Sequence, residues 1–301
     1  MEIIKVTPRG YCQGVVRAIR TARQTITENP GVPVYMLGMI VHNEFVVREF
    51  ESLGMICLED PAKTRLELLD QINSGIVIIT AHGAGDEVFR KAREKGLTVV
   101  DATCPDVEKT HKLVREHVTH GDVVYIGKKN HPEAEGTISI SPRVHLVTCV
   151  EDVESLPQLE NILITCQTTL SVLETCKLIN ACMQRFPDAS AAPEICNATR
   201  VRQEAVMNLK DTDLLIVVGD PRSNNSNQLR RIGTESGIPD CLMIESSADL
   251  TEEMIRDKKR IAVTSGSSTP TALTDGVIAV LEHYAETSVF DLSADTHSSI
   301  L

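Results

Sequence analysis

The chain has 301 residues, of which 42% are hydrophobic and 24% are charged, so its composition is that of a globular protein and excludes a disordered chain, a collagen-like fibre and a coiled coil. Its net charge of −12 and aromatic content of 3% argue against nucleic-acid binding, which needs clustered cations and stacking side chains. The apolar runs are too short to cross a bilayer, and the first residues lack the features of a signal peptide. We therefore expect a cytoplasmic protein with neither a membrane nor a nucleic-acid partner.

Short apolar strands alternate with helix-like stretches along the chain. After an N-terminal strand at 2–6, the sequence predicts a helix from Gly14 to about Glu28 and a strand at 34–37, followed by a polar loop that carries His42. Further strands, with helices between them, are expected at 55–58, 76–80 and 97–100. Alternation of this kind indicates parallel sheets in an α/β fold.

The same order of elements recurs after cysteines at equal spacing. Cys12, Cys104 and Cys196 are 92 residues apart in turn, and each precedes a helix-like stretch. The later strands are expected at 122–126, 144–147, 161–165, 213–218, 241–244 and 260–264. In each unit, two polar loops follow strands at matching positions in the sequence. The first loop of the three units carries His42, His131 and Asn225 in turn, and the second carries His82, Thr168 and Ser268.

Three pseudo-equivalent α/β modules with small parallel sheets explain this repeat. The predicted modules cover residues 12–100, 101–193 and 194–287. The N-terminal strand in residues 1–11 completes the third module, and residues 288–301 form a tail. Because ligand sites in parallel α/β folds gather at the carboxyl ends of strands, the polar loops of all three modules can serve one site.

The nine cysteines do not suggest disulfides, since their number is odd and no Cys-x-x-Cys pair is present. Three thiols at matching positions fit either zinc, which usually takes four ligands, or an iron–sulfur cluster. Three cysteines on a four-iron cubane would leave one iron open to bind a substrate oxygen. We interpret the other six cysteines as packing residues, and His111, His117 and His120 as solvated.

Eight motifs resemble those of the 4-hydroxy-3-methylbut-2-enyl diphosphate reductases, which act last in the non-mevalonate isoprenoid pathway, and the resemblance runs in order from Pro8 to about Pro270. They are PRGYCQGVVRAI, VHNEFVV, AHG, DATCPDVEKTH, HPEAEGT, QTTLS, NATRVRQ and NNSNQL. The resemblance implies three modules around a central [4Fe–4S] cluster. It also implies a reductase that removes the allylic C4 hydroxyl of its substrate, giving isopentenyl and dimethylallyl diphosphate plus water, with a ferredoxin or flavodoxin as electron donor.

The resemblance also implies roles for individual residues. Cys12, Cys104 and Cys196 match the three cluster ligands. Glu133 matches the proton donor, and Thr168 and His131 complete the catalytic group. The substrate-binding residues implied are His42, His82, His131, Thr168, Ser223, Asn224, Asn225 and Ser268. The chain departs from the family pattern in two loops, where it has Ser-Asn-Asn-Ser at 223–226 and Gly-Ser-Ser-Thr-Pro at 266–270.

The residue types suit this chemistry. Loop N–H groups, helix N-termini, hydroxyls and imidazoles together can hold a diphosphate without Lys or Arg. Glu133 can act as a general acid, although a carboxylate at that place can also serve a helix N-terminus. Two alternatives stay open: a cluster dehydratase without redox chemistry, and a diphosphate-binding module. A hydrolase that uses Cys104 lacks the glycine signature of a strand–nucleophile–helix turn.

Overall fold

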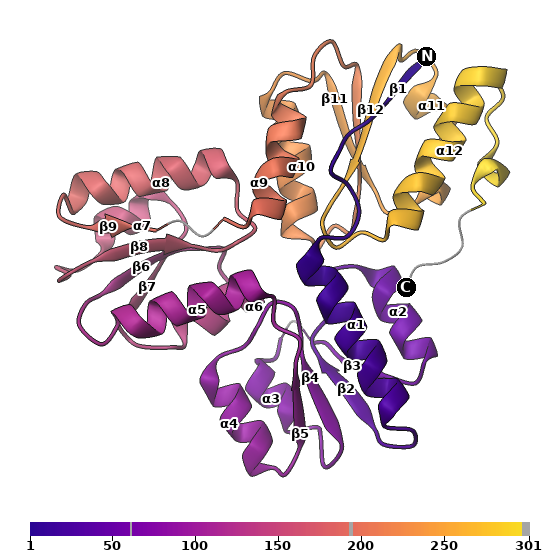
Figure 1. Cartoon of the computed structure of the whole chain (residues 1–301). Coiled ribbons are helices and arrows are strands. Elements are labelled where there is room, and N and C mark those ends of the chain that lie inside the picture. Colours follow the sequence, from indigo (N-terminus) through magenta and orange to yellow (C-terminus); the bar gives the residue numbers. More distant parts are fainter. Residues whose placement is uncertain (61, 193–194, 297–301) are drawn as a thin grey trace. The chain divides into compact units, whose positions relative to one another are not determined.

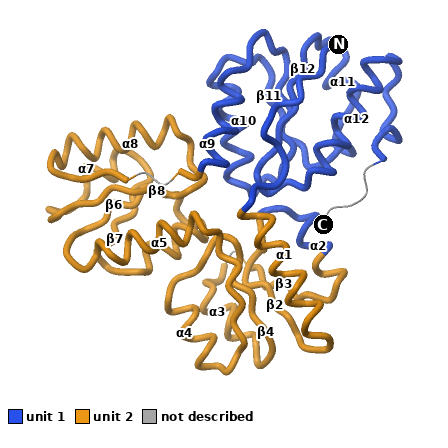
Figure 2. Tube along the Cα trace, viewed as in Figure 1, with its two compact units in different colours: residues 1–13, 42–49, 197–301 blue, residues 14–41, 50–196 orange. Residues whose placement is uncertain are grey.

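The computed structural model describes residues 1–60, 62–192 and 195–296. Contacts divide the chain into two compact units (Figure 2). Unit 1 comprises residues 1–13, 42–49 and 197–301, and unit 2 comprises residues 14–41 and 50–196. The three module boundaries remain a prediction, and the one between residues 193 and 194 lies outside the described residues.

Unit 2 contains two four-stranded parallel sheets (Figure 1). The first has the strand order β3-β2-β4-β5. Its strands are β2 (Val34–Leu37), β3 (Ile56–Leu58), β4 (Ile76–Ile79) and β5 (Thr98–Asp101). The helices in this stretch of chain are α1 (Gln13–Glu28), α2 (Glu44–Ser52), α3 (Arg65–Leu69) and α4 (Asp86–Glu94). Buried side chains of α3 and α4, among them Leu69 and Val88, form one core with Val77 and Ile79 of β4.

The second sheet of unit 2 has the order β7-β6-β8-β9. Its strands are β6 (Val123–Ile126), β7 (Val144–Val147), β8 (Leu163–Cys166) and β9 (Ser190–Ala191). The associated helices are α5 (Pro105–His117), α6 (Pro132–Ile138), α7 (Val150–Ser155) and α8 (Val172–Arg185). One face packs against α7 and α8 and the other against α5 and α6, so the sheet is covered on both sides.

Unit 1 contains the third sheet, in the order β1-β12-β10-β11. Its strands are β1 (Glu2–Lys5), β10 (Leu214–Val218), β11 (Asp240–Ile244) and β12 (Arg260–Ser265). Its helices are α9 (Asn197–Met207), α10 (Asn224–Glu235), α11 (Glu252–Ile255) and α12 (Thr271–Thr287), with two 3₁₀ turns, η1 (Ser247–Asp249) and η2 (Leu292–Ala294). The first strand of the chain thus pairs in parallel with β12, its last strand among the described residues.

The strand β10 shows why these apolar runs become central strands. All five of its residues are buried, and successive side chains enter opposite cores. Leu214, Ile216 and Val218 pack with α12, whereas Leu215 and Val217 pack with α9 and α10. A strand buried on both faces reads as a continuous apolar run, which is the pattern in the sequence.

The predicted α/β class with three small parallel sheets is confirmed, and the observed strands begin and end within two residues of the predicted ones. The two-residue strand β9 was not predicted, because two residues carry no alternation pattern. Part of the predicted tail is packed rather than loose. Phe290 and Ala294 contact the core of unit 1, and Asp295 accepts a hydrogen bond from Ser247 at 2.6 Å. Residues 297–301 lie outside the described part of the tail.

Among the described residues, we find no helix with both the length and the apolarity needed to cross a membrane.

Candidate active site

The predicted site residues follow the carboxyl ends of strands, as expected for a parallel α/β fold. In unit 2 they are His82 after β4, Cys104 after β5, His131 and Glu133 after β6, Thr168 after β8 and Cys196 after β9. In unit 1 they are Cys12 after β1, Ser223, Asn224 and Asn225 after β10, and Ser268 after β12, together with His42.

Glu133 and Thr168 of unit 2 are joined by two hydrogen bonds. The Thr168 backbone N–H donates to Glu133 Oε1 at 2.7 Å, and the Thr168 hydroxyl lies 3.0 Å from Glu133 Oε2. The Glu133 side chain is 1% exposed. Burial raises the pKa of Glu133 to about 7, against the lowering effect of the two hydrogen bonds from Thr168. The carboxyl can therefore both hold and release a proton near neutral pH.

His131 lies two residues before Glu133, and one of its ring nitrogens is already engaged. It is the N-cap of α6, and its Nδ1 accepts a hydrogen bond from the Glu133 backbone N–H at 3.2 Å. Because that nitrogen accepts, it carries no proton, and the ring proton is on Nε2. The ring of His82 meets His131 edge to face, with 5.7 Å between centroids. The loops after β4 and β6 therefore bring these two imidazoles together.

Two of the three predicted cluster ligands belong to unit 2, and each is tied to a loop of the site. The backbone N–H of Cys104 donates to the carbonyl of Ala81, next to His82, at 3.0 Å. The backbone N–H of Cys196 donates to the carbonyl of Thr168 at 3.1 Å. Both cysteines are partly buried and neither takes part in a disulfide.

The predicted diphosphate-binding residues of unit 1 form a connected set of hydroxyl and amide groups. Ser223 caps α10 by accepting from the Ser226 backbone N–H at 3.3 Å, so Asn224 and Asn225 stand in the first turn of a helix. The Ser268 hydroxyl donates to the His42 carbonyl at 3.0 Å and lies 3.4 Å from Ser223 Oγ. A helix N-terminus with hydroxyls around it is a suitable site for an anion.

The third predicted ligand, Cys12, is connected to the same loops. Its backbone N–H donates to the Ser267 carbonyl at 3.1 Å, and Asn225 Nδ2 donates to Ser267 Oγ at 3.1 Å. Cys12 is likewise partly buried and outside any disulfide. Within the described residues, no group of three or more His, Cys, Asp or Glu side chains is gathered as a metal site. The three-cysteine ligand set therefore stays a prediction.

Some residues that support the site were not predicted. Asp220, which is 2% exposed, accepts from the Glu44 backbone N–H at 3.0 Å and so fixes the segment after His42. Arg222 donates to Asp220 at 2.7 Å and 2.9 Å. Burial opposes ionisation of Asp220, but these hydrogen bonds lower its pKa overall. The sequence signal that could have identified Asp220 is its position just after the apolar strand β10, where parallel α/β folds place their sites.

Gln167, the first residue of the QTTLS motif, also supports the site. Its Oε1 accepts from the Lys128 backbone N–H at 3.0 Å, and its Nε2 donates to Thr169 Oγ1 at 3.0 Å. The side chain is completely buried. Gln167 therefore joins the loop before His131 to the loop that carries Thr168.

Two interpretations of residues outside the site were wrong. His111, expected in solvent, is 4% exposed, and burial lowers its pKa to about 4. It shares the inner face of α5 with Val107 and Val114, which its charged neighbours obscured. Cys176, expected to pack, is exposed on α8.

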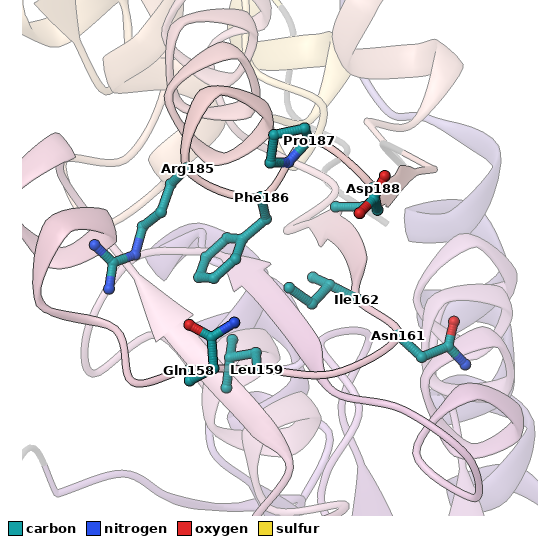
Figure 3. A pocket seen from close by; sticks show the side chains of 9 residues that line it. Gln158, Leu159, Asn161, Ile162, Arg185, Phe186, Pro187 and Asp188 are labelled. Carbon is teal, nitrogen blue, oxygen red and sulfur yellow. The ribbon is translucent and has the colours of Figure 1, made fainter.

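A cavity of about 220 Å³ lies away from these residues (Figure 3). It is lined by Gln158, Leu159, Asn161, Ile162, Arg185, Phe186, Pro187, Asp188 and Ala189. These residues precede β8 and β9, so the cavity is at the amino-terminal edge of the second sheet. Ligand sites in parallel sheets use the opposite edge, and none of the predicted site residues lines this cavity.

A buried acid, a pair of adjacent imidazoles and cysteines outside any disulfide, all on loops that follow strands of unit 2, are typical of an enzyme that combines acid catalysis with a thiol-bound metal centre. Comparison with known proteins makes this class specific. The model of the LytB protein family matches residues 3–282. The chain therefore belongs to the LytB family of 4-hydroxy-3-methylbut-2-enyl diphosphate reductases, which are oxidoreductases.

Curated relatives are similar over almost their whole length. The 4-hydroxy-3-methylbut-2-enyl diphosphate reductase of Brevibacillus brevis is 50% identical over 292 residues, which covers 95% of this chain and 93% of the relative. The enzyme of the same name from Anoxybacillus flavithermus is 49% identical over 290 residues, which covers 94% and 91%.

Solved structures share the fold. The E-1-hydroxy-2-methyl-but-2-enyl-4-diphosphate reductase from Plasmodium falciparum has a TM-score of 0.86 at 28% identity and covers 100% of this chain and 94% of its own. A solved (E)-4-hydroxy-3-methyl-but-2-enyl diphosphate reductase, described as the terminal enzyme of the non-mevalonate pathway, has a TM-score of 0.67 at 31% identity, with 94% and 100% coverage.

Proposed function

We propose that this chain reductively removes the C4 hydroxyl of 4-hydroxy-3-methylbut-2-enyl diphosphate. The reaction takes up two electrons and two protons and gives isopentenyl or dimethylallyl diphosphate plus water. The observation that carries the proposal is the buried Glu133 carboxyl, held at both oxygens by Thr168, with a pKa of about 7. A general acid works best when its pKa is close to the working pH, and release of hydroxide as water needs such an acid.

The contacts of Glu133 suggest a path for its proton. Oε1 accepts from a backbone N–H, which cannot be reversed, so the acid proton of Glu133 belongs on Oε2 and points to the Thr168 hydroxyl. When Glu133 is protonated, Oε2–H donates to Thr168 Oγ1, and the hydroxyl hydrogen of Thr168 is free to donate onward. Transfer from Glu133 to Thr168, and of the Thr168 hydrogen to the departing oxygen, then delivers one proton without moving either residue.

The proposed cofactor is a [4Fe–4S] cluster held by Cys12, Cys104 and Cys196. These cysteines are partly buried, take part in no disulfide and lie in loops that follow strands, and thiolates are the ligands that such clusters use. When bound, the cluster supplies electrons one at a time and an iron without a protein ligand that acts as a Lewis acid on the hydroxyl. The proposed electron donor is a ferredoxin or flavodoxin, and the proposed location is the cytoplasm.

We assign the diphosphate to the hydroxyl and amide groups of Ser223, Asn224, Asn225 and Ser268 and to His42. The α10 N-terminus supports this assignment, because the N–H groups and the dipole at the start of a helix favour an anion. We assign His82 and His131 to hydrogen bonds with the substrate, with His131 also in the catalytic group. A ring proton on Nε2 makes His131 a donor to an anionic or hydroxyl oxygen.

Metal analysis tests the proposal. Protein purified or reconstituted without oxygen is expected to contain about four irons and four acid-labile sulfides per chain, as a cubane requires. One iron should change its Mössbauer signal when 4-hydroxy-3-methylbut-2-enyl diphosphate is added. A chain that binds the diphosphate but takes up no iron would instead be a binding module. An iron-loaded chain that consumes the diphosphate without a reductant would be a dehydratase.

A further inference from the structure

The side chain of Thr80, the residue that follows β4, has its hydroxyl within reach of both Arg65 and His82. It is completely buried, and its hydroxyl oxygen lies 3.1 Å from Arg65 Nη2 and 3.5 Å from His82 Nδ1. The second distance is at the long end of the hydrogen-bond range, as is common in active sites without substrate. All three residues belong to unit 2.

The direction of both hydrogen bonds follows from the chemistry of the groups. A guanidinium has five N–H donors and no acceptor, so the Thr80 oxygen accepts from Arg65. The single hydroxyl hydrogen of Thr80 is then directed to His82 Nδ1, the ring atom in reach. We propose that Arg65, through Thr80, makes Nδ1 of His82 an acceptor and thereby fixes the ring proton of His82 on Nε2.

Arg65 is well placed for such a role because its guanidinium is held on several sides. It also donates to the carbonyl of Gly83, so its two contacts lie on either side of His82 in the sequence. The carboxylates of Glu59 and Glu135 are near enough to favour its charge. Burial lowers the pKa of Arg65 only to about 10, so it remains a donor at neutral pH.

His82 and His131 would then both present the same ring atom, a protonated Nε2, to the substrate. For His131 the donor to Nδ1 is the backbone N–H of Glu133, and for His82 it is Thr80. In both rings the proton is on Nε2, which makes that atom a hydrogen-bond donor. This inference rests on the proposed substrate role of His82. Arg65 and Thr80 are positioning residues, because they act through His82.

The direct test is the tautomer of His82 in the cluster-loaded protein labelled with ¹⁵N-histidine. The His82 signals are those that disappear in His82→Gln. The proposal expects an Nδ1 shift typical of an acceptor and an Nε2 shift typical of N–H, unchanged in Thr80→Ser and changed in Thr80→Val and Arg65→Met. A protonated Nδ1 in the wild-type protein, or a tautomer that Thr80→Val leaves unchanged, overturns the proposal.

Substrate binding to the oxidised, cluster-loaded protein gives a second test. Thr80→Val should raise the dissociation constant for 4-hydroxy-3-methylbut-2-enyl diphosphate about fivefold, which is the effect of losing one hydrogen bond. Thr80→Ser should bind the substrate about as tightly as wild type. In a His82→Gln background, Thr80→Val should change binding by less than about twofold, because the ring through which it acts is gone. An equal loss in both backgrounds overturns the proposal.

The two tests separate this inference from the proposed function. If the tautomer responds to Thr80→Val as expected while His82→Gln binds substrate like wild type, the arrangement of Arg65, Thr80 and His82 is supported and the proposed substrate role of His82 is wrong.

Discussion

Both carboxylate oxygens of Glu133 are bound by one residue, Thr168, which is 35 positions away in the sequence. The backbone N–H contact fixes the orientation of the carboxyl, and the hydroxyl contact gives its proton a partner. The N–H can donate to Oε1 in either protonation state, and the Thr168 hydroxyl can donate to the carboxylate or accept from the protonated acid, so both contacts can persist whether Glu133 is ionised or neutral. This explains how a completely buried carboxyl can change its protonation state without rearrangement of the site.

Glu133→Gln should retain the cluster and bind substrate but lose turnover. The glutamine oxygen can accept from the Thr168 N–H, and its amide can donate to the Thr168 hydroxyl, so the geometry is preserved while the transferable proton is lost. We expect kcat to fall by a factor on the order of 10² to 10⁴. Glu154→Gln, at an exposed position of α7, is the matched control and should be close to wild type. Near-normal turnover in Glu133→Gln would show that another group is the acid.

The rate should depend on pH through Glu133. Its pKa is about 7, and the protonated form is the reactive one, so kcat should be highest below this value and fall as the pH rises through it. A viologen radical is a suitable reductant because its potential does not change with pH. A profile that stays flat from pH 6 to 9 would contradict the assignment.

Thr168→Val should shift this profile. The Thr168 hydroxyl bond favours the carboxylate and lowers the pKa of Glu133, so its removal should raise that pKa further and move the alkaline limb to higher pH. The maximal rate should also fall, because the hydroxyl that passes on the proton is absent. Thr168→Ser keeps the hydroxyl, so the alkaline limb of its pH profile should stay at the wild-type pH and most of the maximal rate should be retained. A limb at the same pH in Thr168→Val would contradict the assigned hydrogen bond.

Each of the substitutions Cys12→Ser, Cys104→Ser and Cys196→Ser should abolish stable iron binding, because each thiolate is a proposed ligand. Cys176→Ser is the control, since its thiol is exposed on α8, and Cys57→Ser is a second one. Iron and acid-labile sulfide are measured on each variant after the same anaerobic reconstitution. Equal iron retention in all five proteins would remove the ligand assignment.

Asp220→Asn should weaken the hydrogen bonds that hold the segment after His42 in place. Its carboxylate accepts from the Glu44 N–H and from Arg222, and an amide keeps only part of this set. We expect the KM for substrate to rise roughly three- to tenfold, with kcat near wild type, since the lost interactions act on binding. Asp257→Asn, an exposed position, is the control. A loss confined to kcat would place Asp220 in the chemical step instead.

The repeat of strands and cysteines was sufficient to predict three parallel sheets and the loops that carry the site. The reason is local: central strands such as β10 are buried on both faces and appear as apolar runs, and polar loops follow them. The spacing does not single out Glu133 or Thr168; their proposed roles as acid and partner come from the resemblance.

The supporting residues could not be predicted in the same way. Arg65 and Thr80 are 15 positions apart, and Asp220 reaches Glu44 across 176 positions, so their contacts exist only once the chain is folded. His111 was misjudged because the polar residues around it conceal an inward face of α5 that repeats at helical spacing. In each case tertiary packing, and not local sequence, decides the environment of the side chain.

The most direct test of the central claim is the electron balance of the reaction. Anaerobically reconstituted protein is mixed with 4-hydroxy-3-methylbut-2-enyl diphosphate and a reduced viologen, and products and oxidised viologen are counted together. The account predicts isopentenyl and dimethylallyl diphosphate, two viologen radicals oxidised for each product molecule, and no product without reductant. Consumption of the substrate at the same rate without reductant, or substrate binding without any turnover in the presence of a loaded cluster, would contradict it.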